Sequence, residues 1–148
     1  MKGESIYGLI TNYHVASGNR SWKQTNLDIF GRTHVRLHPV LPNYIACIAN
    51  HFNVDAQHLL RHSTGFPLYA FSLGDTASAL ADHMLAQNGR FMSRVSRQAP
   101  FALPLEKHHK YCPHCVAHYF NDSGKMTWLI EHQLYGVSIC PIHGCSLE

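Results

Sequence analysis

Apolar residues recur at intervals of three and four along much of the chain, which is the period of one helix face. The first such stretch, residues 4–16, carries this spacing at Ile6, Leu9, Ile10 and Tyr13. Residues 21–31 predict a second helix, and both its start and its end carry recognisable signals. Ser21 and Gln24 have the spacing of a capping box, in which each side chain bonds the backbone N–H of the other, and Gly31 is a typical stop.

Three more helices follow from the pattern. Pro42 suits the first turn of a helix whose apolar stripe consists of Ile45, Ile48, Ala49 and Phe52. A shorter helix should cover residues 55–62, and another should begin at Asp75 or Thr76 and run to Gly89. Strand-like alternation is scarce. The sequence therefore predicts a mainly α fold.

Residues 62–71, HSTGFPLYAF, separate two of these helices and combine turn-forming residues with four apolar ones: Phe66, Leu68, Tyr69 and Phe71. We predict a buried connection that lays its aromatic rings across the helix ends, since such clusters are less often binding loops.

The chain has 148 residues, a formal net charge of +3 and thirteen histidines. This length allows one domain or two small ones, with a core that needs no disulfides. No apolar run reaches the ~18 residues of a membrane span, and residues 1–5 lack the apolar part of a secretory signal. We therefore expect no membrane partner and a reducing, cytoplasmic compartment.

Four of the five cysteines lie in one tract, residues 112–145. A reducing compartment and an odd number of cysteines both argue against a disulfide framework. The tract reads C-x2-C-x24-C-x2-H, and each two-residue gap lets two ligands point at one ion while backbone N–H groups approach the sulfurs. Three thiolates and one imidazole form the closed tetrahedral shell of structural zinc. We predict one zinc ion, bound by Cys112, Cys115, Cys140 and His143.

Alternatives remain open for this tract. Cys145 could replace His143 as the fourth ligand, although the repeated C-P-x-[CH] form favours His143. The two C-P-x-[CH] segments could also be coincidental turns that hold buried free thiols. Cys47, in an apolar run, is interpreted as a small core residue. A closed four-ligand site leaves no coordination role for the nearby histidines, which we place at the surface or beside a ligand: His108, His109, His114, His118 and His132.

A catalytic zinc site would bring a general base with it, and the sequence contains no recognised arrangement. There is no H-E-x-x-H helix, and no H-x-E accompanies the cysteines as in zinc deaminases. A phosphate-binding G-x-x-x-x-G-K-[ST] loop and a G-x-S-x-G nucleophile elbow are also absent. A zinc-dependent enzyme is therefore the minor alternative.

Basic residues gather before the first cysteine pair. Arg90, Arg94 and Arg97 would share one face of a helix, and Lys107 and Lys110 extend the positive charge. A solvated face is one interpretation, and contact with phosphates or an acidic partner is the other. The net charge of +3 is small for a stand-alone DNA binder, so it favours a protein-interaction module over a DNA-binding module.

The segments ESIYGLI and FPLYAF, and above all residues 110–147, resemble the TniQ/TnsD family of target-selection proteins of bacterial transposons. The resemblance covers essentially the whole chain. Its specific part consists of Tyr111, Cys112, Pro113, Cys115, Trp128, Cys140, Pro141, His143, Gly144 and Leu147.

The resemblance implies a helix-turn-helix-like helical region, residues 1–106, joined to a zinc-finger region, residues 107–148, with the same four zinc ligands. It also implies a non-enzymatic adaptor that marks an insertion site and recruits the transposon's AAA+ ATPase, a TnsC-like protein. Family members bind target DNA themselves or join an RNA-guided Cascade-type complex. Direct recognition of the attachment site is thus the alternative function, and the bacterial nucleoid is the expected location.

Two features depart from the family pattern. Ser63 separates His62 from Thr64, and the segment YAF lacks a proline that relatives carry near the phenylalanine, so the local backbone should differ. TnsD-type members also continue into a large C-terminal region that contributes sequence-specific DNA binding. We therefore expect this chain to represent only part of such a protein.

Overall fold

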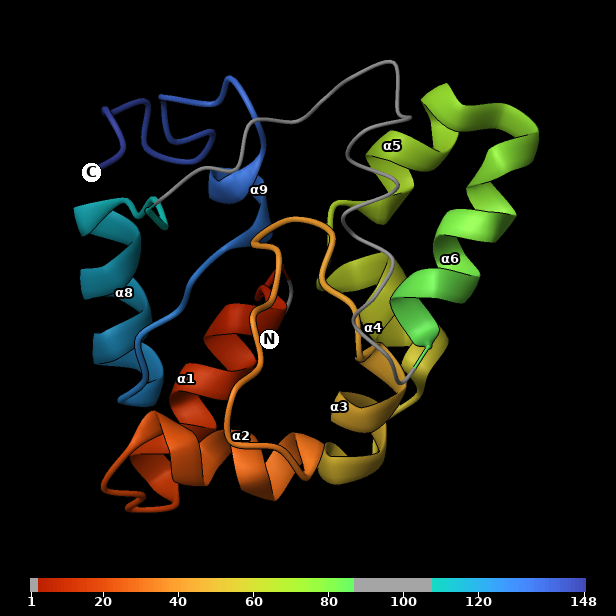
Figure 1. Ribbon diagram of the computed structural model, residues 1–148. Helices are drawn as coiled ribbons and strands as arrows, with labels where there is room; N and C mark the ends of the chain where they lie inside the picture. The colour runs from red at the N-terminus through yellow and green to blue at the C-terminus, as the bar shows by residue number, and fades with distance from the viewer. Residues whose placement is uncertain (1–2, 87–107) are drawn as a thin grey trace.

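The amphipathic stretches of the sequence fold into helices, as the computed structural model of the chain shows (Figure 1). The structure describes residues 3–86 and 108–148. Within these residues the β-structure consists of two isolated bridges, so the prediction of a mainly α fold is confirmed. The helices are α1 (Ile6–Ala16), α2 (Trp22–Phe30), α3 (Ile45–Phe52), α4 (Ala56–His62), α5 (Phe66–Leu73), η1 (Gly74–Thr76), α6 (Ala77–Leu85), α8 (Pro113–Ser123) and α9 (Ile130–Gln133).

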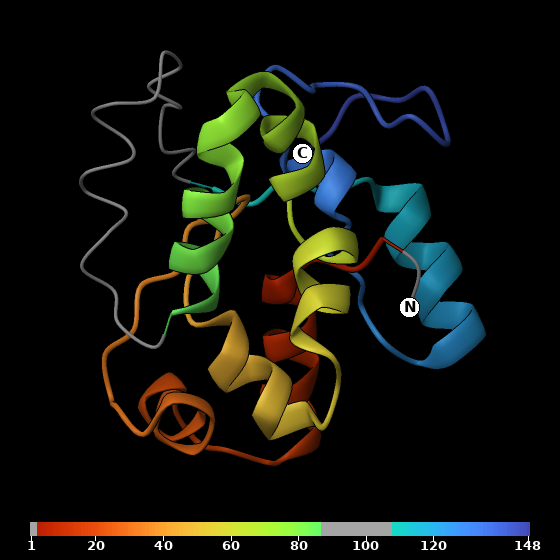
Figure 2. The ribbon, with the colours of Figure 1, turned by 90° about the vertical axis from the view of Figure 1, so that its right-hand side faces the viewer.

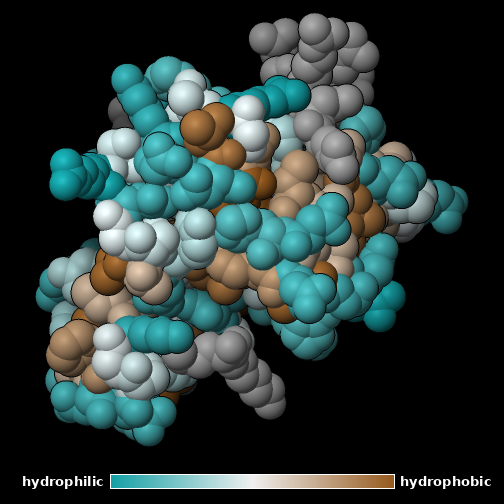
Figure 3. All heavy atoms as spheres, turned by 90° about the horizontal axis from the view of Figure 1, so that it is seen from below, coloured by the Kyte–Doolittle hydropathy of each residue, from teal (hydrophilic) through white to brown (hydrophobic). Residues whose placement is uncertain are grey.

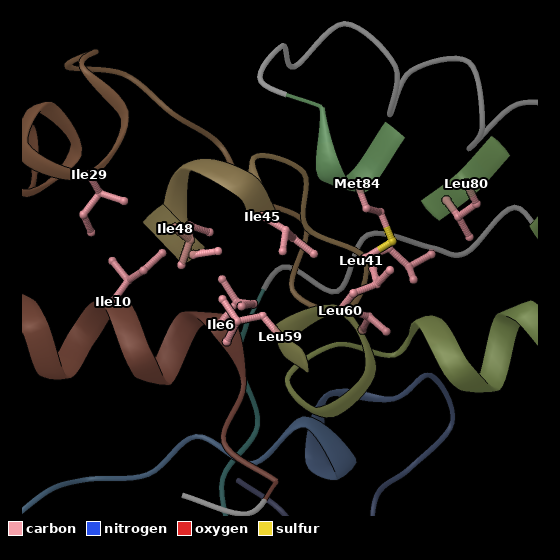
Figure 4. Packing of buried hydrophobic residues seen from close by; sticks show 12 residues of the cluster. Ile6, Ile10, Ile29, Leu41, Ile45, Ile48, Leu59, Leu60, Leu80 and Met84 are labelled. Carbon is pink, nitrogen blue, oxygen red and sulfur yellow. The ribbon is translucent and has the colours of Figure 1, made fainter. Parts of the chain in front are cut away.

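The main hydrophobic core lies among α1 to α6 (Figure 4). The apolar faces of α1, α2, α3, α4 and α6 supply most of its buried side chains, whereas α5 packs against it with partly buried residues. Full burial of one aliphatic side chain stabilises the fold by about 1.5–3 kcal/mol. Ile45 and Ile48 of α3 are completely buried at the centre of this packing. The buried members are Ile6, Ile10, Ile29, Val40, Leu41, Ile45, Ile48, Ala49, Leu59, Leu60, Leu80 and Met84.

The starts of α1 and α2 are set by serine caps. The Ser5 hydroxyl accepts the Gly8 backbone N–H at 3.1 Å, and the Ser21 hydroxyl accepts that of Gln24 at 3.4 Å. The predicted capping box is only half formed, because the Gln24 side chain donates to Asp28 at 2.9 Å. The predicted stop at the end of α2 is confirmed, since the following glycine adopts the left-handed conformation with φ 65°.

Helices α3 and α4 form a pair joined by the three residues 53–55. Asn53, with φ 52°, ends α3, and the Asp55 carboxylate accepts the His58 N–H at 2.7 Å to start α4. This short connection matches the helix-turn-helix pattern. The prediction that Pro42 lies in the first turn of α3 is wrong, because Tyr44 takes a left-handed conformation, with φ 63°, and the helix begins after it.

The segment predicted as a buried connection is instead largely helix α5. A proline is favourable in the first turn of a helix, and the Thr64 hydroxyl accepts the Phe66 N–H at 3.1 Å at its entrance. Phe66 and Tyr69 pack against the core, whereas Leu68 and Phe71 are 58% and 94% exposed. The aromatic cluster is therefore divided between the core and the surface.

Helix α6 begins near the predicted residue, with Thr76 at its N-cap. It ends before the predicted Gly89, because Ala86 is already extended with ψ 149°. Gly89 itself lies outside the described residues.

The N-terminal residues are joined to the C-terminal third of the chain. The Ser5 N–H donates to the Trp128 carbonyl at 2.8 Å, and the Ile130 N–H donates to the Gly3 carbonyl at 2.9 Å. The ring of Tyr7 stacks on His109, with centroids 3.7 Å apart. Figures 1 and 2 show α1 between α8 on one side and the α3–α6 group on the other. The division at residues 106 and 107 stays a prediction.

Hydrophilic residues cover much of the face shown in Figure 3, with smaller hydrophobic patches between them. Among the described helices, none has the length and apolar character that a membrane crossing requires.

Candidate metal centre

The first cysteine pair sits at the start of α8, a helix that the sequence analysis did not predict. Cys112 is the N-cap residue and Pro113 occupies the first turn. The Cys115 backbone N–H donates to the Cys112 Sγ at 3.4 Å, so a sulfur performs the capping role that an oxygen usually performs. Both cysteine side chains are buried.

The second pair sits on a tight loop near the C-terminal end of the described chain. The His143 N–H donates to the Cys140 Sγ at 3.4 Å, which repeats the bond of the first pair. Gly144, with φ 66°, turns the chain back, and its N–H donates to the Cys140 carbonyl at 2.9 Å. The Cys140 N–H in turn donates to the Cys145 carbonyl at 2.8 Å. The predicted approach of N–H groups to the sulfurs is thus present in both turns.

The fold brings the two pairs together. The four predicted ligand atoms, of Cys112, Cys115, Cys140 and His143, all lie within 4.8 Å of one another. The Sγ atoms of Cys115 and Cys140 are 3.7 Å apart, and the His143 Nδ1 lies 3.3 Å from the Cys115 Sγ. The same nitrogen lies 3.5 Å from the Cys112 Sγ and 3.7 Å from the Cys140 Sγ.

These distances can be compared with a zinc tetrahedron. Bond lengths of about 2.3 Å to sulfur and 2.0–2.1 Å to nitrogen give edges of about 3.8 Å between sulfurs and about 3.6 Å between sulfur and nitrogen. Four of the six separations, at 3.3–3.7 Å, are close to these edges, and none of the six exceeds 4.8 Å. The donor set and its spacing therefore fit a metal ion of this kind.

The thiols of the cluster influence one another. Burial, together with the neighbouring Cys140 and Cys112 sulfurs, raises the pKa of the Cys115 thiol to about 12. Burial also acts to raise the pKa of Cys112, but hydrogen bonds from the Cys115 backbone and the neighbouring thiols outweigh it, so that this pKa is lowered. Ionisation of several of these thiols side by side would require a compensating cation, which a divalent metal would supply.

Cys145 lies beside the cluster rather than within it. Its Sγ is 3.4 Å from the Cys112 Sγ, but this sulfur is absent from the group of four close donor atoms. The geometry therefore favours His143 as the fourth ligand, as the repeated motif does.

The histidines near the tract occupy different environments. His108, His114 and His118 are exposed, and the His114 ring lies 5.5 Å from that of His143. His109 is partly buried against Tyr7, as described above.

The interpretation of Cys47 needs correction, whereas one of the two alternatives for His132 is excluded. His132 is 1% exposed, so the surface position is excluded and the position beside a ligand remains, and burial lowers its pKa. Its position on α9 turns it inward together with Gln133. Cys47 lies at the edge of the core, because α3 turns Ile45 and Ile48 inward and leaves the thiol partly exposed.

Of the five predicted basic contacts, Lys110 alone lies in the described part of the chain, since Arg90, Arg94, Arg97 and Lys107 fall outside it. The Lys110 ammonium donates to the carbonyls of Leu134 and Val137, at 3.0 and 2.8 Å. This lysine thus has a structural contact in addition to its predicted role, which stays a prediction.

Two contacts that support the cluster were not evident from the sequence. The buried Gln133 side chain donates to the Lys110 carbonyl at 2.7 Å and accepts the Lys110 N–H at 3.1 Å. Tyr111 and Glu148 exchange two backbone hydrogen bonds of 2.9 Å each, next to Cys112. The residues around Gln133 in the sequence give no indication that its side chain bonds to the backbone of Lys110.

The match with known proteins covers the helical part as well as the metal centre. A family model named TniQ matches residues 1–147. The chain is also 30% identical, over 149 residues, to the Transposon Tn7 transposition protein TnsD of Escherichia coli. That alignment covers 95% of this chain but 29% of the relative, so the chain spans less than a third of that protein. Since the family model spans both the core helices and the Cys3His cluster, the chain belongs to the TniQ family.

Proposed function

We propose that the chain is a non-enzymatic target-selection adaptor of a bacterial transposon, which helps to mark the insertion site and recruits a TnsC-like AAA+ ATPase. The observation that carries this proposal is the match of the TniQ model to residues 1–147. The likeness to a transposition protein of Escherichia coli supports it. Such an adaptor works at the nucleoid.

The Cys3His cluster is proposed to hold one structural zinc ion through Cys112, Cys115, Cys140 and His143. Zinc supplies a cross-link between two turns that are distant in the sequence. The N–H groups of Cys115 and His143 would stabilise the thiolates, and Leu129 packs with the three buried cysteines in a small hydrophobic cluster. The role of the centre is therefore to fix the shape of the C-terminal third.

A cluster of four protein ligands leaves no coordination position for water or substrate, so we expect no hydrolytic or deaminating activity. Assays of the purified chain on nucleic acids and nucleosides test this expectation. Reproducible turnover that a Cys140→Ser change abolishes would refute the adaptor proposal in favour of an enzyme.

Exposed apolar side chains support a protein partner. Leu68 and Phe71 of α5 are 58% and 94% exposed, and Tyr135 after α9 is 58% exposed. A Cβ atom placed on Gly65 would lie 3.2 Å from the Tyr69 ring and 3.4 Å from the Leu134 side chain, so these two segments lie close together. Exposed apolar groups of this kind favour contact with protein over contact with the phosphates of DNA.

The decisive experiment mixes the zinc-loaded chain with the cognate ATPase, with and without DNA, and measures complex formation by analytical ultracentrifugation. We expect binding to the ATPase, weakened by Phe71→Ser and unchanged by Ser72→Ala on the same helix. An arm with the transposon's RNA-guided complex, where the element encodes one, tests whether the chain also joins a Cascade-type assembly. Failure of the folded, zinc-loaded chain to bind the ATPase would reject the adaptor role.

A DNA-binding module is the second candidate, favoured by the α3–α4 helix pair. The second helix of such a pair enters the major groove in helix-turn-helix proteins, and Gln57 and Arg61 of α4 are exposed. We expect the chain alone to bind duplexes weakly and without sequence preference, through groups such as Arg90, Arg94 and Arg97. Fluorescence anisotropy at several salt concentrations should then show similar losses for all duplexes when these arginines become alanine. Selection of one sequence by roughly a thousandfold or more would favour direct recognition instead.

A further inference from the structure

Helix α4 carries a close pair of imidazole rings that the metal centre does not use. His58 and His62 are one helical turn apart, and both side chains are exposed. Their ring centroids are 4.5 Å apart, with an angle of 40° between the ring planes. Two histidines at this spacing on one helix face are the arrangement by which metalloprotease helices bind a metal ion.

The packing of α4 fixes which way this pair faces. Leu59 and Leu60 are 6% and 1% exposed, so they hold the opposite face of the helix against the core. The Asp55 carboxylate caps the helix start at His58 N–H, at 2.7 Å. The two rings are thus presented to solvent on a helix whose rotation and start are both determined.

The separation of the rings suits one shared cation. A metal 2.0–2.1 Å from one nitrogen of each ring would lie about 3.2 Å from each ring centre. Ring centres 4.5 Å apart then subtend an angle of about 90° at the ion. This is the angle between neighbouring ligands in octahedral and square-planar complexes, which Ni²⁺ and Cu²⁺ prefer, whereas zinc in a structural site prefers a tetrahedron.

We propose that His58 and His62 form a second metal site, specific for divalent cations of the nickel and copper class. The two imidazoles supply neighbouring nitrogen ligands, and water fills the remaining coordination positions. The site differs from the Cys3His cluster in that the protein supplies only nitrogen ligands, coordination positions stay open, and both side chains are exposed. It does not depend on the adaptor function proposed above.

The chain contains a matched control for spacing alone. His114 and His118 are also one turn apart and exposed, on α8. Their rings have other neighbours, since His114 lies 5.5 Å from the His143 ring and His118 lies 5.4 Å from the Tyr119 ring. If spacing alone decided metal binding, both helices would bind equally well.

The test is a calorimetric titration of the zinc-loaded chain with Ni²⁺, in buffer without chelator. We expect one Ni²⁺ per chain, with affinity reduced about tenfold or more in His58→Ala and in His62→Ala, because the second ligand then no longer binds intramolecularly. His118→Ala should bind as the unchanged chain does. Absence of binding, or a loss confined to His118→Ala, would overturn the proposal.

A second measurement avoids variants altogether. Small amounts of Cu²⁺ broaden the backbone amide signals of nearby residues in the NMR spectrum of the unchanged chain. We expect the signals of residues 56–63 to broaden first. Earlier broadening on α8, or at no defined place, would overturn the proposal even if both variants of α4 were poorly folded.

Discussion

The backbone N–H of Ser5 donates to the carbonyl oxygen of Trp128 at 2.8 Å, so the residue that caps α1 is also bonded to the segment between the two turns of the Cys3His cluster. The Ser5 hydroxyl is occupied at the same time by the Gly8 N–H. One buried serine therefore links the start of the helical core to the segment that connects the two turns of the Cys3His cluster.

The ligand set predicts which cysteine matters most for metal content. Cys112→Ser should lower the zinc content, measured by elemental mass spectrometry of the purified chain, to well below one ion per chain. It should also lower the unfolding temperature, because the free energy of metal ligation contributes to folding. Cys145→Ser should keep close to one ion per chain. Cys47→Ser, remote from the cluster in sequence, is the control. A reversed order of the two cluster variants would show that the ligand set is wrong.

Removal of the metal should also loosen the contact at Ser5. Hydrogen exchange of the chelator-treated chain should become faster at the Ser5 and Ile130 amides, because residues 128–130 lie between the two metal-binding turns. The Gly65 amide, bonded to the Val40 carbonyl at 2.8 Å within the helical core, should keep its protection. Equal acceleration at all three amides would mean that the metal stabilises the whole chain rather than this junction.

Truncation of a buried leucine of α4 and of an exposed leucine of α5 should have very different effects on stability. Leu60 is 1% exposed and Leu68 is 58% exposed. Leu60→Ala should lower the free energy of unfolding by about 2–5 kcal/mol, because it leaves a cavity. Leu68→Ala should change it by about 0.5 kcal/mol or less. Urea titrations of the zinc-loaded variants measure both, and similar losses would contradict the described burial.

His38 should make stability depend on pH. Its Nδ1 accepts the backbone N–H groups of Val40 and Leu41 at 3.1 and 3.0 Å, and burial lowers its pKa below the usual value near 6.5. The unfolded chain therefore takes up this proton first, so the contribution of His38 is complete above about pH 6.5 and is lost as the pH falls toward the lower folded pKa.

The comparison of His38→Asn with the unchanged chain tests this dependence. An amide oxygen can accept the same backbone N–H groups but does not titrate in this range, so the slope of unfolding free energy between pH 7.5 and pH 5.5 should decrease. The same replacement at exposed His34 is the control. An unchanged slope in His38→Asn would contradict the assignment.

The elements that the sequence predicts well are those with local causes. Ser21 caps its helix through its own side chain, as predicted, and the helix stop at Gly31 depends on one left-handed residue. Each CxxC or CxxH turn likewise brings two donors together locally. These features need no knowledge of the tertiary fold.

The errors come from causes that the local pattern does not contain. Helix α8 was missed because the sulfur of Cys112 is an unusual cap, and α5 because its aromatic residues suggested burial. The meeting of the two metal-binding turns was inferred from the motif, but the contacts of Lys110 and Gln133 that support it depend on chain segments far apart in sequence.

The pairing of Gly3 and Ser5 with residues 128–130 has a consequence for synthesis on the ribosome. Helices α1 to α6 can pack as soon as they have emerged, but the first residues must wait for a partner that is translated much later. Until then the Gly3 carbonyl and the Ser5 N–H form hydrogen bonds with water, and the start of α1 lacks the two backbone hydrogen bonds that join it to residues 128–130. The segment around Gly3 and Ser5 is therefore completed only after residues 128–130 have been translated, so pausing of translation before residue 128 would prolong the lifetime of a partly folded intermediate.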